Sequence, residues 1–290
     1  MPTLQSIERA TVPTGHTAEL LVVDNGSIDN TKEAVLAMNA PHLSIRYILE
    51  PRKGKGHAYN TGIAAARGGI LLFTDDDVRV HADWIDGMCR PIISGSADAV
   101  QGGIRIAPHL DRRWLTGSLR IWVAAVEDPI HPPEGLVGAN MAFRRDVAQL
   151  VGGFDPRLGP GASGFFDDTV FGWAVARAGK KIAYCPEVAV EHHFSADRLT
   201  PRSYILAARR MAVSHAIVIR DQEPLFSPPT MLNLLQQIPG LVVRGVTQLI
   251  WFAIDNRPDP GFVVRYYQVL LWRCLRIPAG KTPEQPSRRL

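Results

Sequence analysis

The stretch ILLFTDDD, from Ile70 to Asp77, runs a short apolar segment directly into three consecutive aspartates. An apolar run of this kind is typical of a strand that is buried on both faces. Two like charges about 4 Å apart repel by roughly 4 kcal/mol at an effective dielectric constant near 20. The sequence alone leaves three ways to offset this repulsion: a bound cation, the N-terminus of a helix, or solvent.

Similar segments on either side of this stretch predict an α/β fold. AELLVVD (18–24), LSIRYIL (43–49) and ADAVQGGIRIA (97–107) are predicted strands, and helical patterns separate them. Strands and helices that alternate at this spacing indicate a mostly parallel, Rossmann-like sheet flanked by helices. Ligands of such sheets bind outside the carboxyl ends of the strands, so Asp24 and Asp75 are expected to face one pocket.

The rest of the chain is predicted to be less regular and then helical. Residues 112–127 are expected to form a helix, and residues 180–194 two short strands, the second of which ends at His192 and His193. Residues 200–278 carry helical patterns and form a predicted C-terminal helical region. The Pro-rich, basic tail 279–290 is expected to be disordered.

Composition narrows the setting. The 290 residues are 46% hydrophobic and 21% charged, and the net charge of +4 gives no reason to expect a nucleic-acid partner. Three scattered cysteines fit a reducing compartment. The start MPTLQSIERATVPTG lacks the pattern of a signal peptide, and the apolar segment Ile238–Ile254 is interrupted by Arg244. We therefore expect a cytoplasmic protein, either soluble or peripheral to the membrane.

Four blocks of sequence carry a family resemblance. They are ELLVVDNGSIDNT (19–31), GKGHAYNTGIAAARGGILLFTDDD (54–77), GANMAFRRDV with VGGFDPRLGPG (138–161), and DDTVFGWAVARAG (167–179). In this order and spacing they resemble family-2 glycosyltransferases, and the resemblance extends from about Leu4 to His193. It implies a GT-A fold in residues 1–199: one α/β domain that binds a nucleotide-sugar and transfers the sugar with inversion, using Mg²⁺ or Mn²⁺.

The resemblance assigns the donor site. Asp24 matches an aspartate that contacts the base, where it would accept the uracil N3–H and favour UDP; its alternative role is to cap the next helix. Asn25 follows it in the substrate-binding set. Asp75 is expected near the ribose or the metal. Asp76 is placed in the same set, although its side chain is expected to point elsewhere.

The resemblance also answers the question raised by the aspartates. Asp77, with Asp75 and His192, would hold a divalent cation that bridges the donor phosphates, because carboxylate oxygens suit such hard cations. The metal would act as a Lewis acid on the departing diphosphate. For His192 and its neighbour His193, a core or surface position remains an equal alternative.

Asp167 and Asp168 match the family's acidic pair below the acceptor site. Asp168 corresponds to the usual catalytic base, which is worth about 10² to 10⁴ in rate. The family often has Glu where this chain has Asp167, so both residues are kept as catalytic candidates, with helix capping as the alternative.

Further residues are assigned to substrate binding by their position. Lys55 and Arg52 lie in a Gly-rich loop and are expected to hold phosphate or to be solvated. Asn60 matches a recurrent Asn that is structural or near the nucleotide. Gly138–Asn140 resembles the loop that lines the sugar and acceptor pocket.

The C-terminal helices lie outside the close match. Their aromatic residues alternate with Arg265, Arg273 and Arg276, which suits either a helix on an anionic membrane or core helices whose arginines extend to the surface. A membrane contact at the inner face of the plasma membrane would suit a lipid-linked acceptor. Arg209 and Arg210 either reach the diphosphate or, as we favour, lie on a solvated face.

The chain departs from the family at its start. Relatives begin with a central strand that precedes the first helix, and this strand is missing from the sequence, which would leave unpaired backbone groups on its neighbours. A misassigned start codon, a natural truncation and replacement by another segment are the three explanations, and we favour the first.

The resemblance implies that the chain is an inverting, metal-dependent glycosyltransferase. It also implies, from the habit of the family rather than from residues of this chain, an acceptor hydroxyl of a glycan or lipid-linked saccharide in surface polysaccharide synthesis. The alternatives are a truncated, inactive nucleotide-binding module and a nucleotidyltransferase. The latter would normally show a Gly-rich, basic phosphate loop after the first strand, and this sequence has none there.

Overall fold

The computed structural model describes residues 2–127, 135–221, 239–240, 242–246, 248 and 258–275. The chain divides into two compact units. The first comprises Met1–Ala162 and Asp167–Phe194, and the second Ser163–Phe166 and Ser195–Leu290. The predicted tail 279–290 and Arg276 lie outside the described residues, as does most of the apolar segment Ile238–Ile254.

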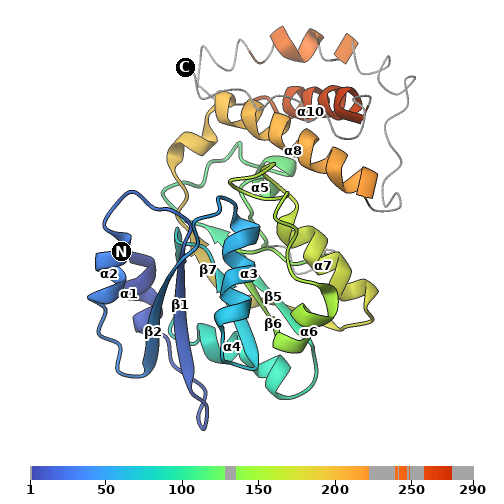
Figure 1. The fold of residues 1–290 in the computed structure, drawn as a ribbon. Coiled ribbons are helices and arrows are strands. Elements are labelled where there is room, and N and C mark those ends of the chain that lie inside the picture. The colour runs from blue at the N-terminus through green and yellow to red at the C-terminus, as the bar shows by residue number, and fades with distance from the viewer. Residues whose placement is uncertain are drawn as a thin grey trace. The chain divides into compact units, whose positions relative to one another are not determined.

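The first unit alternates helices and strands (Figure 1). Its helices are α1 (Pro2–Glu8), α2 (Thr31–Leu36), α3 (Lys55–Ala65), α4 (Trp84–Ile93), α5 (Ser118–Ile121), α6 (Arg145–Val151) and α7 (Asp167–Arg177). Its strands are β1 (Ala18–Asp24), β2 (Leu43–Leu49), β3 (Ile70–Thr74), β4 (Val78–Arg79), β5 (Ala99–Ile106), β6 (Asn140–Arg144) and β7 (Ile182–His192).

The sheet is mixed, so the prediction of a mostly parallel sheet is wrong. β1 and β2 form a parallel pair, and a second sheet has the order β3-β6-β5-β7-β4. β6 runs antiparallel to both β3 and β5, and β4 runs antiparallel to β7; only β5 and β7 pair in parallel there. The regular strand–helix alternation that predicted a parallel sheet ends before β6, which follows β5 only after residues 107–139.

No hydrogen-bonded strand pair joins the two sheets in the described part of the chain, yet they share one layer. Leu20 of β1 and Leu72 of β3 pack against one hydrophobic cluster, while Leu21 and Leu71 belong to another. Because successive residues of a strand point to opposite faces, this shared alternation places β1 and β3 in the same layer.

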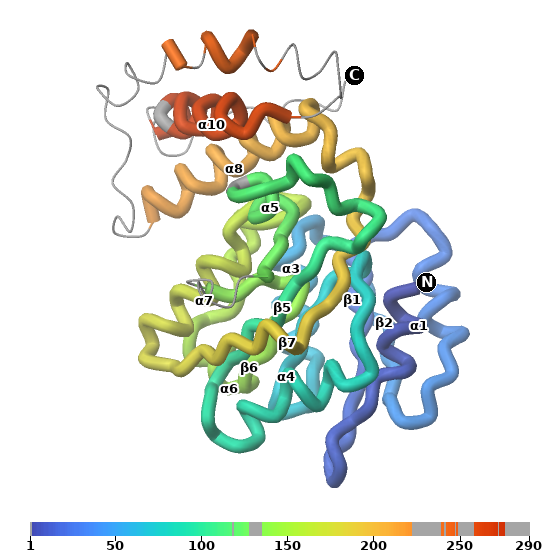
Figure 2. The backbone as a smooth tube through the Cα atoms, turned by 180° about the vertical axis from the view of Figure 1, so that it is seen from behind, coloured from blue at the N-terminus to red at the C-terminus, as the bar shows by residue number. Residues whose placement is uncertain are grey.

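Helices cover both faces of this layer, as the front and back views show (Figure 1, Figure 2). On one face, Trp84 and Met88 of α4 pack with Ala142 of β6. On the other face lies an aromatic cluster that includes Tyr59 of α3, Phe143 of β6, Phe154 and Phe171 of α7. Phe154 and Phe171 stack with their ring centroids 4.2 Å apart. Adjacent residues of β6 thus anchor helices on opposite faces, which fixes α3 and α7 relative to the strand ends.

Two local predictions need correction. The helix expected over 112–127 is reduced to the single turn of α5, and the two strands expected over 180–194 are one strand, β7. β7 stays continuous because a register shift against Gly102 and Gly103 of β5 absorbs the irregularity near Pro186.

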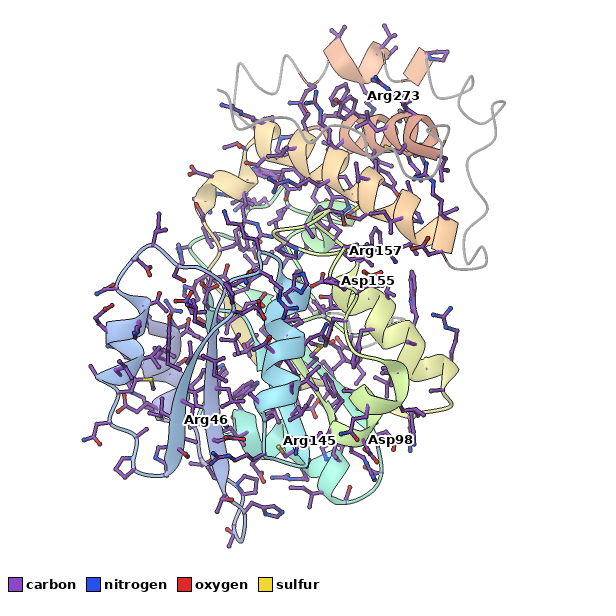
Figure 3. All side chains as sticks on the ribbon, in the orientation of Figure 1. Arg46, Asp98, Arg145, Asp155, Arg157 and Arg273 are labelled. Atoms are coloured by element: carbon purple, nitrogen blue, oxygen red, sulfur yellow. The ribbon has the colours of Figure 1, made fainter. Side chains whose placement is uncertain are left out.

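In the second unit, α8 (Pro201–Asp221) packs against α10 (Pro260–Leu275). Arg209 donates to the Tyr266 hydroxyl (2.8 Å), and Arg273 lies exposed on α10 (Figure 3). No helix among the described residues is both long and apolar enough to cross a membrane.

Candidate functional site

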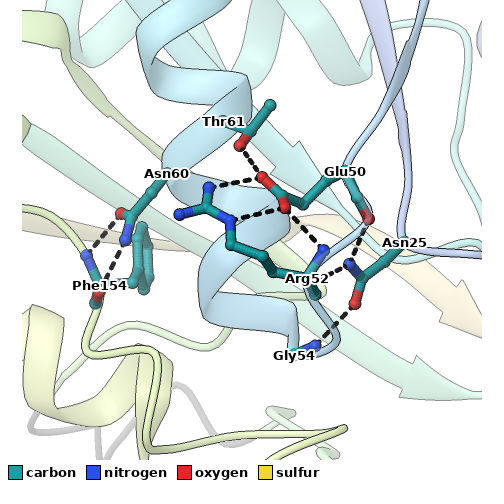
Figure 4. A network of polar contacts seen from close by, with 7 residues as sticks. All are labelled: Asn25, Glu50, Arg52, Gly54, Asn60, Thr61 and Phe154. Carbon is teal, nitrogen blue, oxygen red and sulfur yellow. Dashed lines mark hydrogen bonds and ion pairs between the residues drawn. The ribbon is translucent and has the colours of Figure 1, made fainter.

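A network of polar side chains holds the loop before α3 (Figure 4). Asn25, directly after β1, donates to the carbonyls of Glu50 (2.9 Å) and Arg52 (2.7 Å), and its Oδ1 accepts the Gly54 N–H (2.8 Å). Asn25, predicted to bind substrate, therefore joins the ends of β1 and β2 and fixes the residue that precedes α3.

Glu50 is the buried centre of this network. Its carboxylate accepts Nε (2.8 Å) and Nη2 (2.7 Å) of Arg52 and the hydroxyl of Thr61. These hydrogen bonds, those of Arg52 first, hold the pKa of Glu50 well below its usual range. Arg52, predicted to hold phosphate, directs its guanidinium to Glu50 in this structure.

Lys55 and Tyr59 lie one helical turn apart on α3 and converge on Asp75. Lys55 Nζ is 2.5 Å from Asp75 Oδ1, and the Tyr59 hydroxyl is 3.4 Å from the same oxygen. The Lys55 ammonium also lies over the Tyr59 ring, 5.1 Å from its centroid. Burial lowers the pKa of Lys55, but the surrounding anions, led by Asp75, raise it well above its usual value. Lys55 is therefore a cation held within the predicted site.

The two carboxylates that begin α7 have different surroundings. Asp168 stays partly exposed, and its oxygens accept the N–H groups of Gly138 and Thr169, each at 2.7 Å. Asp167 is only 4% exposed, and its Oδ2 lacks a hydrogen-bond partner within the described chain. Burial, and then the charge of Asp168, raise the pKa of Asp167 to about 7. The structure thus separates an oriented, accessible carboxylate from a buried carboxyl that titrates near neutrality.

Two glycines bring these groups together. At Gly138, a side chain would collide with the Tyr59 hydroxyl and would lie 3.3 Å from Lys55 Nζ. Gly138 therefore connects Asp168 to the pair formed by Lys55 and Asp75. Gly159, with φ +77°, covers Asp167 so closely that a Cβ there would overlap the carboxyl group.

The loop that carries Gly159 is anchored to α3. Asn60 donates to the Phe154 carbonyl and accepts the Phe154 N–H, both at 2.8 Å (Figure 4). The Lys55 N–H donates to the Pro160 carbonyl (2.9 Å). On the same loop, Arg157 pairs with Asp155 at 2.5 Å (Figure 3). Asn60, assigned to substrate binding, here holds backbone rather than an open pocket.

Asp24 lies at the end of β1 and is 6% exposed. Its oxygens accept the Tyr47 hydroxyl and the Ser27 N–H, each at 2.7 Å. Although burial acts in the opposite direction, these hydrogen bonds lower the pKa of Asp24, and in turn Asp24 raises the pKa of Tyr47 to about 12. The predicted contact with a base would use the acceptor positions that these two donors leave.

The ends of β4 and β7 place Asp77 beside His192. His192 Nε2 is 3.2 Å from Asp77 Oδ1, its Nδ1 is 3.0 Å from the Val123 carbonyl, and the residue is 2% exposed. His193 instead contacts Glu191 (3.3 Å). Asp76, directly before Asp77, is an exposed residue.

The pair of Asp77 and His192 fits part of a divalent-metal site. Because the Val123 carbonyl can only accept, Nδ1 of His192 carries a proton, and Nε2 faces the Asp77 carboxylate with a second proton or with a lone pair. Two acceptors at this distance need a proton or a cation between them, and the fixed Nδ1–H is the orienting bond typical of a metal-ligating His. In the described ranges, however, no three His, Cys, Asp or Glu side chains converge on one metal position. Asp75, the third predicted ligand, is paired with Lys55.

Asn140 is completely buried and does not line an open site. Its Oδ1 accepts the Trp84 indole N–H, and its Nδ2 donates to the carbonyls of Gly103 and Val188, all at 2.8 Å. This arrangement ties β5, β6 and the irregular part of β7 together and gives no support to the predicted substrate contact of Asn140.

Three residues of the site were missed by the sequence analysis: Tyr47, Glu50 and Tyr59. Tyr59 lies four residues after Lys55, a spacing that places both on one face because α3 begins at Lys55, a residue that was predicted to lie in the preceding loop. Glu50 directly follows an apolar strand, as Asp24 and Asp75 do, and this signal could have found it. Tyr47 lies within a predicted strand, and nothing in its pattern indicated a contact with Asp24.

Comparison with known proteins identifies relatives of the chain. The profile described as Glycosyl transferase family 2 matches residues 2–150, just over half of the chain. Glycosyltransferase AglE of Haloferax volcanii is 36% identical over 141 residues, which cover 48% of this chain and 46% of that protein. The succinoglycan biosynthesis protein ExoO of Rhizobium meliloti is 38% identical over 146 residues, covering 49% of this chain and 40% of that protein. The chain thus spans less than half the length of these relatives.

Solved structures share the fold at low sequence identity. The mannosyltransferase PcManGT from Pyrobaculum calidifontis, in complex with GDP-Man and Mn²⁺, matches with a TM-score of 0.59 and 20% identity, covering 94% of this chain and 81% of that one. S. aureus TarS in complex with UDP matches with a TM-score of 0.50 and 16% identity, covering 93% and 85%. The predicted resemblance is confirmed, and the chain belongs to glycosyl transferase family 2.

Proposed function

We propose that this chain transfers a sugar, with inversion, from a nucleotide-diphosphate donor to a hydroxyl group. The observation that carries the proposal is the placement of Asp168, oriented by two backbone N–H groups next to the pair of Lys55 and Asp75, while Asp167 is buried. Environments that separate two adjacent carboxyl groups in this way are a guide to which of them acts as the base.

Asp168 is the proposed base. Its carboxylate takes the proton of the acceptor hydroxyl while that oxygen attacks the anomeric carbon from the face opposite the diphosphate. The new carbon–oxygen bond forms as the bond to the diphosphate breaks. Asp167 supports this step by filling the buried position under Gly159 rather than by exchanging a proton with the acceptor.

Three residues are proposed to bind the donor. Asp24 would contact the nucleobase, Lys55 the diphosphate, and Asp75 the ribose or the metal. Asp77 and His192 would hold Mg²⁺ or Mn²⁺, which when bound supplies Lewis-acid stabilisation of the departing diphosphate. The complex of PcManGT with GDP-Man and Mn²⁺ and the complex of TarS with UDP support a metal and a nucleotide-diphosphate donor. The preference for UDP rests on the expected contact of Asp24 with uracil.

The proposed acceptor is a glycan or a lipid-linked saccharide in surface polysaccharide synthesis, at the cytoplasmic face of the membrane and without a nucleic-acid partner. The similarity to a succinoglycan biosynthesis protein supports this assignment.

Calorimetric titration of UDP and of GDP into the chain, with Mn²⁺ and with EDTA, tests the donor site. We expect UDP binding that requires metal and is lost in Asp77→Ala. Transfer is then assayed with a panel of labelled UDP-sugars. Binding without transfer from any of them would favour the inactive nucleotide-binding module, and the absence of binding to either nucleotide would contradict the proposal.

A further inference from the structure

We propose that Lys55 is an internal counter-ion of Asp75 and must leave this carboxylate before it can take part in binding a divalent cation. The inference rests on the proposed function for the identity of the cation, and it deepens that function by naming the residue that competes with the metal.

The contacts of Asp75 carry the first step. Its Oδ1 faces the Lys55 ammonium at 2.5 Å and the Tyr59 hydroxyl at 3.4 Å. The side chains of Lys55 and Asp75 are only 22% and 23% exposed. Charges at this separation and burial attract more strongly than an exposed pair does. An incoming cation therefore meets a carboxylate oxygen that is already neutralised.

The backbone around Lys55 shows which part of the residue can move. Its N–H donates to the Pro160 carbonyl (2.9 Å), and the preceding Gly54 N–H donates to Asn25 (2.8 Å). These bonds fix the start of α3, whereas the ammonium sits on a flexible four-carbon stem. Gly138 has no side chain, and a Cβ there would lie 3.3 Å from Nζ. Lys55 can therefore exchange Asp75 for another anion without moving the helix.

A donor diphosphate would provide that other anion. When the ammonium moves to a phosphate oxygen, Asp75 is released for the metal, so nucleotide and metal each favour the binding of the other. Coupling of this kind is reciprocal by thermodynamic necessity. Lys55 then weakens metal binding in the absence of nucleotide and strengthens it in its presence.

The test measures the dissociation constant of Mn²⁺ directly, by electron paramagnetic resonance of the free ion, with and without UDP. Lys55→Met removes the ammonium and keeps most of the side chain. Lys53→Met removes the same charge from an exposed position two residues away and is the matched control. Without UDP, we expect Lys55→Met to bind Mn²⁺ about tenfold more tightly than wild type and Lys53→Met to stay within about twofold. The tightening that UDP causes should shrink in Lys55→Met alone.

Unchanged or weaker Mn²⁺ binding in Lys55→Met would overturn the inference, and so would undetectable Mn²⁺ binding in all three proteins. The comparison without UDP does not depend on the nucleotide. A wild-type protein that binds Mn²⁺ but no UDP would therefore count against the proposed function and leave the result for Lys55 interpretable.

A second measurement uses the wild-type protein in case Lys55→Met does not fold. Reductive ¹³C-methylation labels the six lysines (Lys32, Lys53, Lys55, Lys180, Lys181 and Lys281) and keeps their charge. Lys55→Arg assigns the Lys55 signal. We expect this signal to shift when Mg²⁺ is added without nucleotide, while that of Lys53 does not. A Lys55 signal that stays in place while Mg²⁺ saturates the protein would overturn the inference.

Discussion

Asp167 and Asp168 are neighbours in sequence that the fold places in unlike surroundings, one buried beneath Gly159 and the other held by the N–H groups of Gly138 and Thr169. We expect Asp168→Asn to lower the rate of sugar transfer by about 10² to 10⁴, because it removes the proton acceptor. Asp167→Asn should retain at least roughly a tenth of the rate, since burial raises the pKa of the carboxyl it replaces and so favours its neutral form. Single-turnover assays with matched donor and metal make the comparison. Equal losses of rate in the two variants would mean that the assignment of Asp168 as the base is wrong.

The raised pKa of Asp167 also predicts a dependence of stability on pH. Between the ordinary carboxyl value of 3.8 and the folded value of about 7, the folded chain binds more protons than the unfolded chain. The contribution of Asp167 to the free energy of unfolding therefore falls as pH rises through this window and is constant above it. Asp167→Asn should abolish that fall. The difference between variant and wild type, measured by urea unfolding at pH 5 and pH 8, should grow by at most roughly 3 kcal/mol.

At the scale of single residues, the sequence analysis located the charged residues of the site but did not predict which side chains are buried. The aspartates after β1 and β3 and at the start of α7 were found because charged residues next to apolar strands and at helix starts are visible in the pattern. Burial is not visible. The amide of Asn140 was assigned to substrate, and that of Asn60 either to a structural role or to the nucleotide. Both hold backbone, of Gly103 and of Phe154, partners that are distant in the sequence.

Helix α3 and the loop before α7 form the frame of the site. Lys55 and Tyr59 on α3 point to Asp75, while Asn60 and Thr61 hold the flanking loops. A single helix therefore positions both the Lys55–Asp75 pair and the loop that carries Gly159 over Asp167. A change in that loop should therefore alter the surroundings of the carboxylates.

Substitutions at two glycines that have similar backbone conformations test this coupling. Gly152 and Gly159 have φ +84° and +77°, but only at Gly159 would a Cβ meet Asp167; at Gly152 it meets nothing within 4 Å. Alanine in this conformation costs roughly 1 kcal/mol by itself. We expect Gly152→Ala to lose about that much stability with little change in transfer. Gly159→Ala should lose clearly more and also reduce transfer. Thermal unfolding and rate assays on both variants measure these losses. Equal losses of stability and of transfer rate in the two variants would contradict the proposed role of the contact between Gly159 and Asp167.

Most strands were predictable because their apolar runs are pronounced: β1 and β2 have the bounds predicted for residues 18–24 and 43–49, and β5 lies within the predicted 97–107. The direction of β6 was not predictable from the sequence, because strand direction depends on the path of the chain between elements rather than on composition. The two-residue strand β4 was also missed; it forms only by pairing with the end of β7 and has no periodicity of its own.

At the scale of the whole molecule, membership of family 2 rests on residues 2–150. The carboxylates that begin α7, and His192 at the end of β7, lie outside this match. The nucleotidyltransferase alternative gains no support, because the family model that matches residues 2–150 is that of glycosyl transferase family 2.

The break between β1 and β3 has a consequence for amide protons. Successive N–H groups of a strand point to opposite edges, so β2 can protect only alternate residues of β1. Hydrogen exchange along Ala18–Asp24 should therefore be slow and fast in turn, whereas Ala99–Gln101 of β5, paired with both β6 and β7, should be slow throughout. Nuclear magnetic resonance can resolve the two patterns residue by residue. Uniformly slow exchange in β1 would mean that its second edge is covered in solution, and a period of two would mean that the layer remains open where its two halves meet.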